Sequence, residues 1–324
     1  MGTLLISTEA GYILSFFAYF IATLLRKRQI AIFGAILLIA AVGSQIAYLA
    51  HGEMRHLLLS ISVMYVLAFL SYMLYLILKN KDVGVLGTAS LSIGSAFLVT
   101  YLAAMWITLG RPPWGGIYEF YPCFALSMAV VYLVMEQRMK SRALGFIITP
   151  FAGLFVIWFY GMNYAYGPLM PALQSYWMIL HVAVAIIAYG MFAIAFCFGV
   201  IYLIKERLLL KEFKGFFVTE LPDLPALDKL TYITIMAGLP FQALLLILGA
   251  VWAEEAWGTY WGWDPKEVWS LITFVIYMIF AHGRFSWGKN IKKLMIHGAV
   301  WGFVAVLFTL LGVTYLLPGL HSYK

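Results

Sequence analysis

Long apolar stretches separated by short polar connections run through the whole chain, and they are the feature that most constrains its fold. A helix that crosses a bilayer needs about 20 apolar residues, and in lipid every backbone polar group must be bonded internally. The sequence therefore predicts an all-α integral membrane protein with about ten transmembrane helices. The shortest stretch, 268–283, is expected to begin earlier. The stretches are 9–26, 31–50, 57–79, 83–108, 117–136, 143–161, 175–204, 231–253, 268–283 and 294–317.

Basic residues gather in alternate connections between these stretches. Of the 21 Lys and Arg residues, only Arg55, Arg111, Lys266 and Lys324 lie on the opposite side from the others. Because the more basic connections of a membrane protein face the cytoplasm, both termini and the connection between 253 and 268 are expected to lie outside. This bias accounts for the net charge of +7, so nucleic-acid binding is not needed to explain it. The first stretch has its basic cluster after it and is expected to be a retained helix rather than a signal peptide.

The longest connection without a spanning stretch is 205–230, where charged residues alternate with Leu and Phe. We expect a short amphipathic piece on the cytoplasmic surface, ended by Pro222 and Pro225, with docking of a partner subunit as the alternative. The two cysteines, Cys123 and Cys197, lie far apart inside apolar stretches. They cannot form a Cys-x-x-Cys motif, which excludes a thiol-disulfide transporter.

Three tryptophans and one tyrosine crowd the outer connection before the ninth stretch. An aromatic belt at the membrane interface accounts for one or two of them, but belt residues are scattered rather than packed into one loop. Small glycines between the large rings indicate a surface on which a flat aromatic ligand can lie. The segment reads Trp257-Gly258-Thr259-Tyr260-Trp261-Gly262-Trp263-Asp264-Pro265-Lys266-Glu267.

Histidines supply the second part of the pattern, because imidazole is costly to bury in lipid and marks a site or an interior hydrogen bond. His181 is expected about 9 Å inside the outer start of its helix, and His321 just past the outer end of the last one. Two imidazoles beside an aromatic surface suit an iron porphyrin. His282 is expected near the inner end of the ninth helix. His51 and His56 are interpreted as solvated loop residues, and His297 as making an interior hydrogen bond.

The segment from Trp257 to Glu267 resembles the tryptophan-rich "WWD" signature of haem-handling proteins, W-G-x-x-W-x-W-D-P-K-E, and within them the CcsA/ResC subunit of the system II cytochrome c synthase. Further segments are similar to the external and membrane-buried histidine segments of that family. A loop near residue 115 is also similar, although Gly116 stands where the family tends to show Asn. The resemblance covers roughly 173–323, and earlier residues agree mainly in hydropathy. These segments are Leu173–Trp177 with His181, Ala281–Arg284, Gly319–Tyr323 and Pro112–Glu119.

The resemblance implies two regions, N-terminal helices over 1–172 and a haem-handling domain over 173–324. It implies that haem b, as substrate, enters from the cytoplasmic half, held by His282 and by a ligand from a CcsB/ResB-type partner subunit. At the outer site His181 and His321 would ligate the iron. There an apocytochrome c with Cys-x-x-Cys-His would dock, and its thiols would add to the haem vinyl groups. Three tryptophans would line the porphyrin: Trp257, Trp261 and Trp263.

The resemblance places the chain in a cytochrome c synthase complex and assigns no catalytic residue to it. The membrane would be the bacterial cytoplasmic membrane, or a thylakoid-type membrane in a plastid or cyanobacterium. From the residues themselves, Asp264 is expected to cap the helix that follows it, since Asp before Pro is a favoured helix start, with a direct haem role as the second reading. Arg111 and Lys266 are hypothesised to pair with haem propionates because of their side and charge.

Two other classes of protein stay open. A quinone-linked di-haem cytochrome b would pair His181 with His321 and His282 with His297, but it has no use for the tryptophan loop. A non-haem transporter of an aromatic solute would have polar residues at mid-membrane, where these stretches carry almost no charge.

Overall fold

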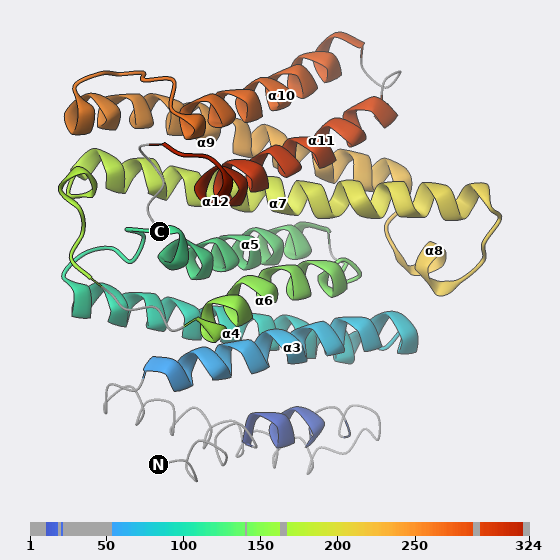
Figure 1. Ribbon diagram of the computed structural model, residues 1–324. Coiled ribbons are helices and arrows are strands. Elements are labelled where there is room, and N and C mark those ends of the chain that lie inside the picture. Colours follow the sequence, from blue (N-terminus) through green and yellow to red (C-terminus); the bar gives the residue numbers. More distant parts are fainter. Residues whose placement is uncertain are drawn as a thin grey trace. The chain divides into compact units, whose positions relative to one another are not determined.

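The structure is a computed structural model that describes residues 11–18, 21, 54–139, 141–162, 167–287 and 292–319. Throughout these ranges the regular structure is helical, and every apolar stretch predicted from residue 57 onward is a helix. The first two predicted stretches fall largely outside the described residues, although 11–18 are helical. The helices are α3 Met54–Leu78, α4 Lys81–Leu109, α5 Ile117–Met139, α6 Gly145–Gly161, the 3-10 helix η1 Pro171–Leu173, α7 Tyr176–Leu210, α8 Phe216–Glu220, α9 Leu224–Trp257, α10 Pro265–Trp287, α11 Lys292–Leu307, the π-helical η3 Phe308–Gly312 and α12 Val313–Leu316 (Figure 1).

Within the described residues, seven helices are long and apolar enough to cross a membrane, one of them running from Leu294 through η3 to Leu316. The helix α6 is shorter and equally apolar. The protein is thus a multi-pass membrane protein. As expected, the ninth stretch begins early, because α10 starts at Pro265.

Two compact units divide the chain, and the helix α5 contributes to both. In the first unit, α3 packs against α4 and α6, and the last turns of α5 complete it. Its buried carboxylate, Glu136, accepts hydrogen bonds from Tyr72 (2.7 Å) and Thr88 and pairs with Arg142 at 3.5 Å. These four side chains come from different segments, so the carboxylate ties the unit together at one end.

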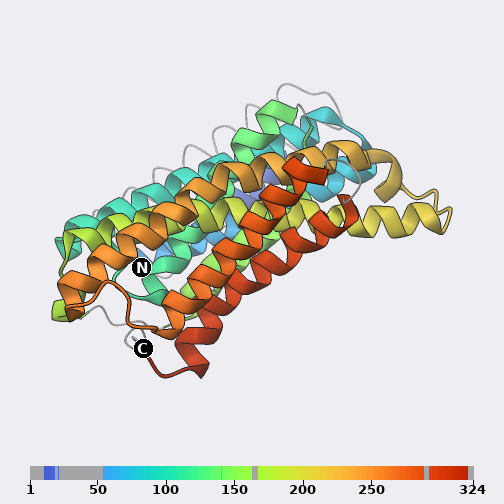
Figure 2. The same cartoon turned by 90° about the horizontal axis from the view of Figure 1, so that it is seen from above.

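The second unit consists of Arg111–Val131 and the chain from 164 onward. The helix α7 packs along α9, α10 packs against α9, and α11 packs against α7, α9 and α10 (Figures 1 and 2). The first half of α5 joins through Phe120, whose ring lies 6.3 Å from Tyr189. Side-chain caps start the long helices: Ser175 accepts from the N–H of Trp177, and Asp223 from that of Ala226. The unit therefore has well-defined helix ends, and these ends build the cavity described below.

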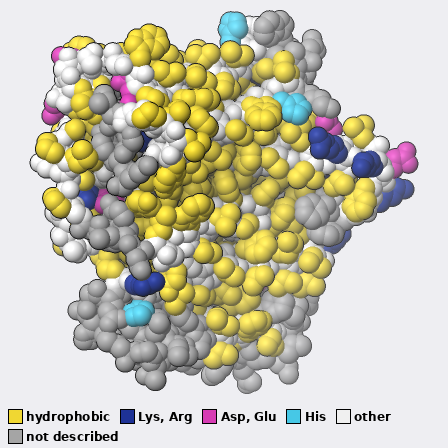
Figure 3. Space-filling model, viewed as in Figure 1, with side chains coloured by type: hydrophobic (Ala, Val, Ile, Leu, Met, Phe, Trp, Pro, Cys, Tyr) yellow, Lys and Arg dark blue, Asp and Glu magenta, His cyan; other side chains and the backbone are white. Residues whose placement is uncertain are grey.

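The connection between α7 and α9 contains one short helix, α8, which ends two residues before Pro222, as expected of a short piece there. Lys205 is buried there and donates to the carbonyls of Leu221 (2.7 Å) and Pro222 (2.9 Å). The prediction that Pro225 ends a surface helix is wrong. It lies in the first turn of α9, where a missing N–H costs nothing. Basic side chains gather around this connection (Figure 3).

Candidate functional site

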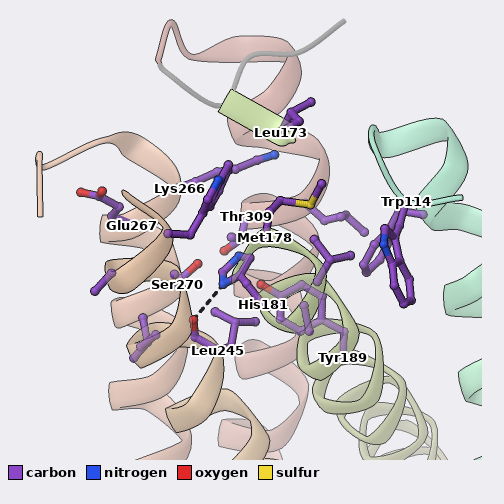
Figure 4. Close-up of a pocket in the computed structure, with 18 of the residues that line it drawn as sticks. Trp114, Leu173, Met178, His181, Tyr189, Leu245, Lys266, Glu267, Ser270 and Thr309 are labelled. Carbon is purple, nitrogen blue, oxygen red and sulfur yellow. Dashed lines mark hydrogen bonds between the residues drawn. The ribbon is translucent and has the colours of Figure 1, made fainter. Parts of the chain in front are cut away.

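A cavity lies inside the second unit, between the first turns of α5, α7 and α10 and the last turns of α9. It holds about 1090 Å³ of space between atoms, including the part open to the surroundings. His181 lies at its centre in Figure 4, with Trp114 on one side and Lys266 on the other. Its walls are mostly apolar, with polar groups from Lys266, Glu267, Ser270 and Thr309.

The imidazole of His181 has a defined orientation. It belongs to the second turn of α7, and its Nδ1 lies 2.9 Å from the carbonyl oxygen of Leu245 in α9. A carbonyl only accepts, so in the neutral ring Nδ1 carries the proton and Nε2 keeps its lone pair. Histidines that ligate metals commonly donate their other ring N–H to a backbone carbonyl in this way. His181 is therefore held in the tautomer that can ligate iron.

A glycine makes this hydrogen bond possible. Gly249 lies one turn after Leu245 in α9, and a Cβ there would be 2.8 Å from Cε1 of His181 and 2.9 Å from its Nδ1. Behind the imidazole, the ring of Trp252 is centred 5.7 Å away and tilted by 34°. Trp252 is buried and donates from its indole N–H to the carbonyl of Ala172 at 2.8 Å. The imidazole of His181 thus packs between the backbone of α9 at Gly249 and the indole of Trp252.

The three tryptophans at the end of α9 and in the connection to α10 occupy different places. Trp261 lines the cavity. Trp257 ends α9 and packs against Trp252, with ring centroids 4.9 Å apart, so it supports the wall from behind. Trp263 is 74% exposed, does not line the cavity, and has a left-handed backbone with φ of 57°. Of the three tryptophans expected to lie against one porphyrin, Trp261 is the one that lines this cavity.

Asp264 and Glu267 organise the end of this connection. The carboxylate of Asp264 accepts from the N–H of Lys266 at 3.1 Å, so the prediction that it caps α10 is confirmed. Glu267 accepts from the N–H of Asp264 at 3.1 Å, which completes a reciprocal capping box. The same Glu267 oxygen accepts from the N–H of Gly262 at 2.9 Å. Both residues act on the backbone around Trp263.

The loop before α5 forms another wall of the cavity, with Trp114, Gly115 and Gly116 lining it. The fully buried Glu119 accepts two hydrogen bonds from Arg111 (2.8 and 2.9 Å) and one from the N–H of Gly115 at 2.7 Å. The guanidinium of Arg111 is thus engaged inside the protein. Of the two cations hypothesised to pair with propionates, Lys266 is the one that lines the cavity.

The last helix changes its winding beside the cavity. Thr309 and Leu310 line the cavity and belong to η3, the π-helical turn. Single π turns inside α-helices are frequent at functional sites, since they shift side chains relative to the regular helix. At the end of this segment, a Cβ on Gly319 would lie 2.6 Å from the carboxylate of Asp264. The chain therefore reaches the start of α10 two residues before His321, which itself, like His51, lies outside the described residues.

The remaining histidines lie away from this cavity. His282 is exposed on α10, with Nε2 3.3 Å from the hydroxyl of Ser286. Two residues later, Arg284 pairs with the buried Asp228 of α9 through two hydrogen bonds. His297 is half-buried in α11, and His56 lies in the first turn of α3 in the other unit. None of the three lines the cavity.

Several residues that line the cavity were not predicted from the sequence. Trp252 and Tyr189 look like ordinary apolar core residues, and Gly249 like a packing glycine. Trp114 differs from these residues, because it lies in the segment Pro112–Glu119, whose sequence resembles the family. The other residues are recognisable only once α7 and α9 are seen side by side.

Comparison with known proteins identifies the family of this chain. The model of the cytochrome c assembly protein family matches residues 114–321, from the Trp114 wall to the last histidine. The chain is similar to the cytochrome c biogenesis protein CcsA of Guillardia theta, with 34% identity over 282 residues that make up 79% of this chain and 92% of the relative. For CcsA of Microcystis aeruginosa the identity is 32%, covering 74% and 87%. For CcsA of Marchantia polymorpha it is 30%, covering 82% and 95%.

The family match covers more of the chain than the segments from residue 173 on that carried the resemblance. It includes the loop before α5, which lines the cavity. The chain belongs to the CcsA family of cytochrome c biogenesis proteins.

Proposed function

We propose that this protein binds haem b as a substrate in the cavity around His181 and presents it for covalent attachment to apocytochrome c. The observation that carries the proposal is the hydrogen bond from Nδ1 of His181 to the carbonyl of Leu245. It sets the tautomer whose Nε2 can ligate iron, inside an otherwise apolar pocket. Apolar walls with one oriented imidazole are the surroundings that a porphyrin requires.

His321 is the proposed second axial ligand. Its support is the closeness of Gly319 to Asp264, which places the residue two positions before His321 beside the start of α10. Two neutral imidazoles hold iron in a six-coordinate, low-spin state and protect it from other ligands. The histidine of an apocytochrome Cys-x-x-Cys-His segment would then replace one of them.

The cavity walls suggest how the haem is oriented. Trp261 and Trp114 offer flat apolar faces from two different loops. Lys266 supplies a cation for a propionate, while Arg111 is already paired with Glu119. With the propionates held, the vinyl edge would face the apocytochrome. Each thiol S–H adds across one vinyl group, forming a C–S and a C–H bond without net oxidation or reduction. Asp264, as the cap of α10, keeps this edge of the site in place.

His282 is proposed as the ligand of an earlier, inner haem position. Its side chain is exposed on α10. Because an imidazole that faces lipid costs free energy, we expect another protein to cover this position. The proposed cover is a CcsB/ResB-type membrane subunit that supplies the other ligand.

The test is the absorption and electron paramagnetic resonance spectrum of the purified protein, alone and with its partner subunit. We expect a low-spin bis-imidazole signal that His181→Gly and His321→Gly each abolish, and that added imidazole restores. His56→Gly is the matched control, because His56 lies in the other unit. Holocytochrome yield should fall together with the signal.

Two outcomes contradict the proposal. One is wild-type protein that takes up no haem, with or without the partner. The other is haem that is reduced by quinol and never transferred to an apocytochrome, which would instead favour a di-haem cytochrome b.

A further inference from the structure

Two walls of the cavity are loops that lead into helices and carry tryptophans. The first loop runs from Arg111 to Gly116 and leads into α5, and the second runs from Gly258 to Asp264 and leads into α10. Trp114 of the first and Trp261 of the second both line the cavity. Loops of this kind, with glycines beside large aromatic residues, have little intrinsic rigidity. Their positions therefore depend on what holds their backbones.

Each loop is held by a glutamate at the third position of the helix that follows it. In α5 this is Glu119, which is fully buried, accepts from the N–H of Gly115 at 2.7 Å, and is itself fixed by two hydrogen bonds from Arg111. The bonded N–H belongs to the residue directly after Trp114. A carboxylate acceptor makes these hydrogen bonds stronger than neutral ones. The loop thus cannot move without breaking a buried charged contact.

In α10 the corresponding residue is Glu267. One of its carboxylate oxygens accepts from the N–H of Gly262 (2.9 Å) and from that of Asp264 (3.1 Å), which are the residues on either side of Trp263. Trp263 has a φ of 57°, in a region that costs energy for a residue with a side chain. That conformation persists only because its neighbours are fixed. The same fixation sets the position of Trp261, whose ring contacts that of Trp263 edge-on at 5.9 Å.

We propose that Glu119 and Glu267 are positioning residues that hold the two tryptophan loops apart at the width a flat ligand needs. They bind the loop backbones rather than the ligand. The inference rests on the proposed haem function for the ligand, and on the hydrogen bonds alone for the fixation of the loops. Loss of either carboxylate would let its loop relax into the cavity or away from it, while the His181 imidazole would keep its hydrogen bond to Leu245.

The test compares Glu267→Ala, Glu267→Gln and Glu119→Gln with wild type and with Glu212→Ala, an exposed carboxylate in the α7–α9 connection. Amide hydrogen exchange of peptides covering 258–264 and 112–116 reports the fixation without any ligand. Haem titration reports its consequence. We expect Glu267→Ala to speed exchange in 258–264 and to weaken haem binding roughly 10-fold, the effect of losing one or two charged hydrogen bonds. Glu267→Gln, which keeps an acceptor oxygen, should stay within about 3-fold of wild type.

At saturating haem, the Glu267→Ala spectrum should match that of wild type, because the axial ligands are intact, whereas His181→Gly should change it. Glu119 differs from Glu267 because both of its oxygens bind Arg111, so an amide there loses one of these hydrogen bonds and leaves the guanidinium without a counter-charge. Glu119→Gln should therefore speed exchange in 112–116 and leave 258–264 unchanged. Unchanged exchange in Glu267→Ala, or haem affinity equal to that of Glu212→Ala, would overturn the proposal. If wild type binds no haem, it is the haem function that fails, and the exchange data still decide whether the glutamates fix the loops.

Discussion

At the scale of single residues, the orientation of His181 depends on the lack of a side chain at Gly249. The imidazole of His181 reaches the carbonyl of Leu245 across the space that a Cβ on Gly249 would fill. Gly249→Ala places a methyl group 2.8 to 2.9 Å from the ring, which must then rotate and lose its hydrogen bond. Overpacking of this kind costs about 1–3 kcal/mol.

We therefore expect Gly249→Ala to weaken haem binding roughly 10-fold and to broaden the low-spin signal, since 1.4 kcal/mol corresponds to a factor of ten. The measurement is a haem titration with electron paramagnetic resonance of the saturated protein. Gly161→Ala is the control, because a Cβ there meets no atom within 4 Å. A Gly249→Ala protein with the affinity and spectrum of wild type would show that the Leu245 hydrogen bond does not set the ligand.

Residue patterns select candidate side chains for the site, but they do not predict which way those side chains face. Composition identifies Trp257, Trp261 and Trp263 as a group, whereas the end of α9 and the left-handed turn at Trp263 separate them. From charge and expected side of the membrane alone, Arg111 and Lys266 are equally good candidates to pair with a propionate. In the structure the two differ, because Glu119 in the first turn of α5 accepts two hydrogen bonds from Arg111. Directions of this kind follow from backbone geometry that spacing alone does not encode.

At the scale of elements, α9 and α10 are joined near the end opposite to the cavity by an ion pair whose carboxylate is buried and whose guanidinium is partly buried. Arg284 makes two hydrogen bonds to Asp228, and its guanidinium lies over the ring of Tyr232 at 5.4 Å. The pair stands two residues from His282 and fixes the turn of α10 that presents it. The cost of breaking such a pair comes mainly from the charge that is left alone.

Asp228→Asn should consequently destabilise the protein by about 3–5 kcal/mol, and Asp228→Asn combined with Arg284→Gln should recover most of that loss. Thermal unfolding in detergent measures both effects. The isosteric change at an exposed carboxylate, Asp82→Asn, is the control. A double variant no more stable than the single one would show that the two side chains are not energetically coupled.

Element boundaries were predictable where hydropathy changes sharply and not where it changes slowly. The spans of α3, α4 and α5 follow their apolar stretches closely, because lipid requires an unbroken helix there. The helix α9 starts at Leu224, before its stretch, because Asp223 and Pro225 form a good helix start in polar sequence. The π turn at 308–312 has no signal in the hydropathy pattern, since it changes winding and not polarity.

At the scale of the whole molecule, the distribution of charge predicts which end of the second unit faces the cytoplasm. The cavity and the loop 258–264 lie at one end of α9, and the basic connection around α8 lies at the other. If the basic connection is cytoplasmic, the cavity opens on the outer side, where an apocytochrome can reach it after export. The proposed haem delivery therefore requires this one orientation.

Single cysteines test the orientation in intact cells. In a background in which the two buried cysteines, Cys123 and Cys197, are replaced by serine, Thr259→Cys should react with a membrane-impermeant maleimide added from outside. Lys214→Cys, at an exposed position between α7 and α8, should react only after the membrane is permeabilised. The opposite labelling pattern would place the cavity on the cytoplasmic side. His181 would then bind haem before its export instead of presenting it for attachment, and the direction of the proposed pathway would have to be reversed.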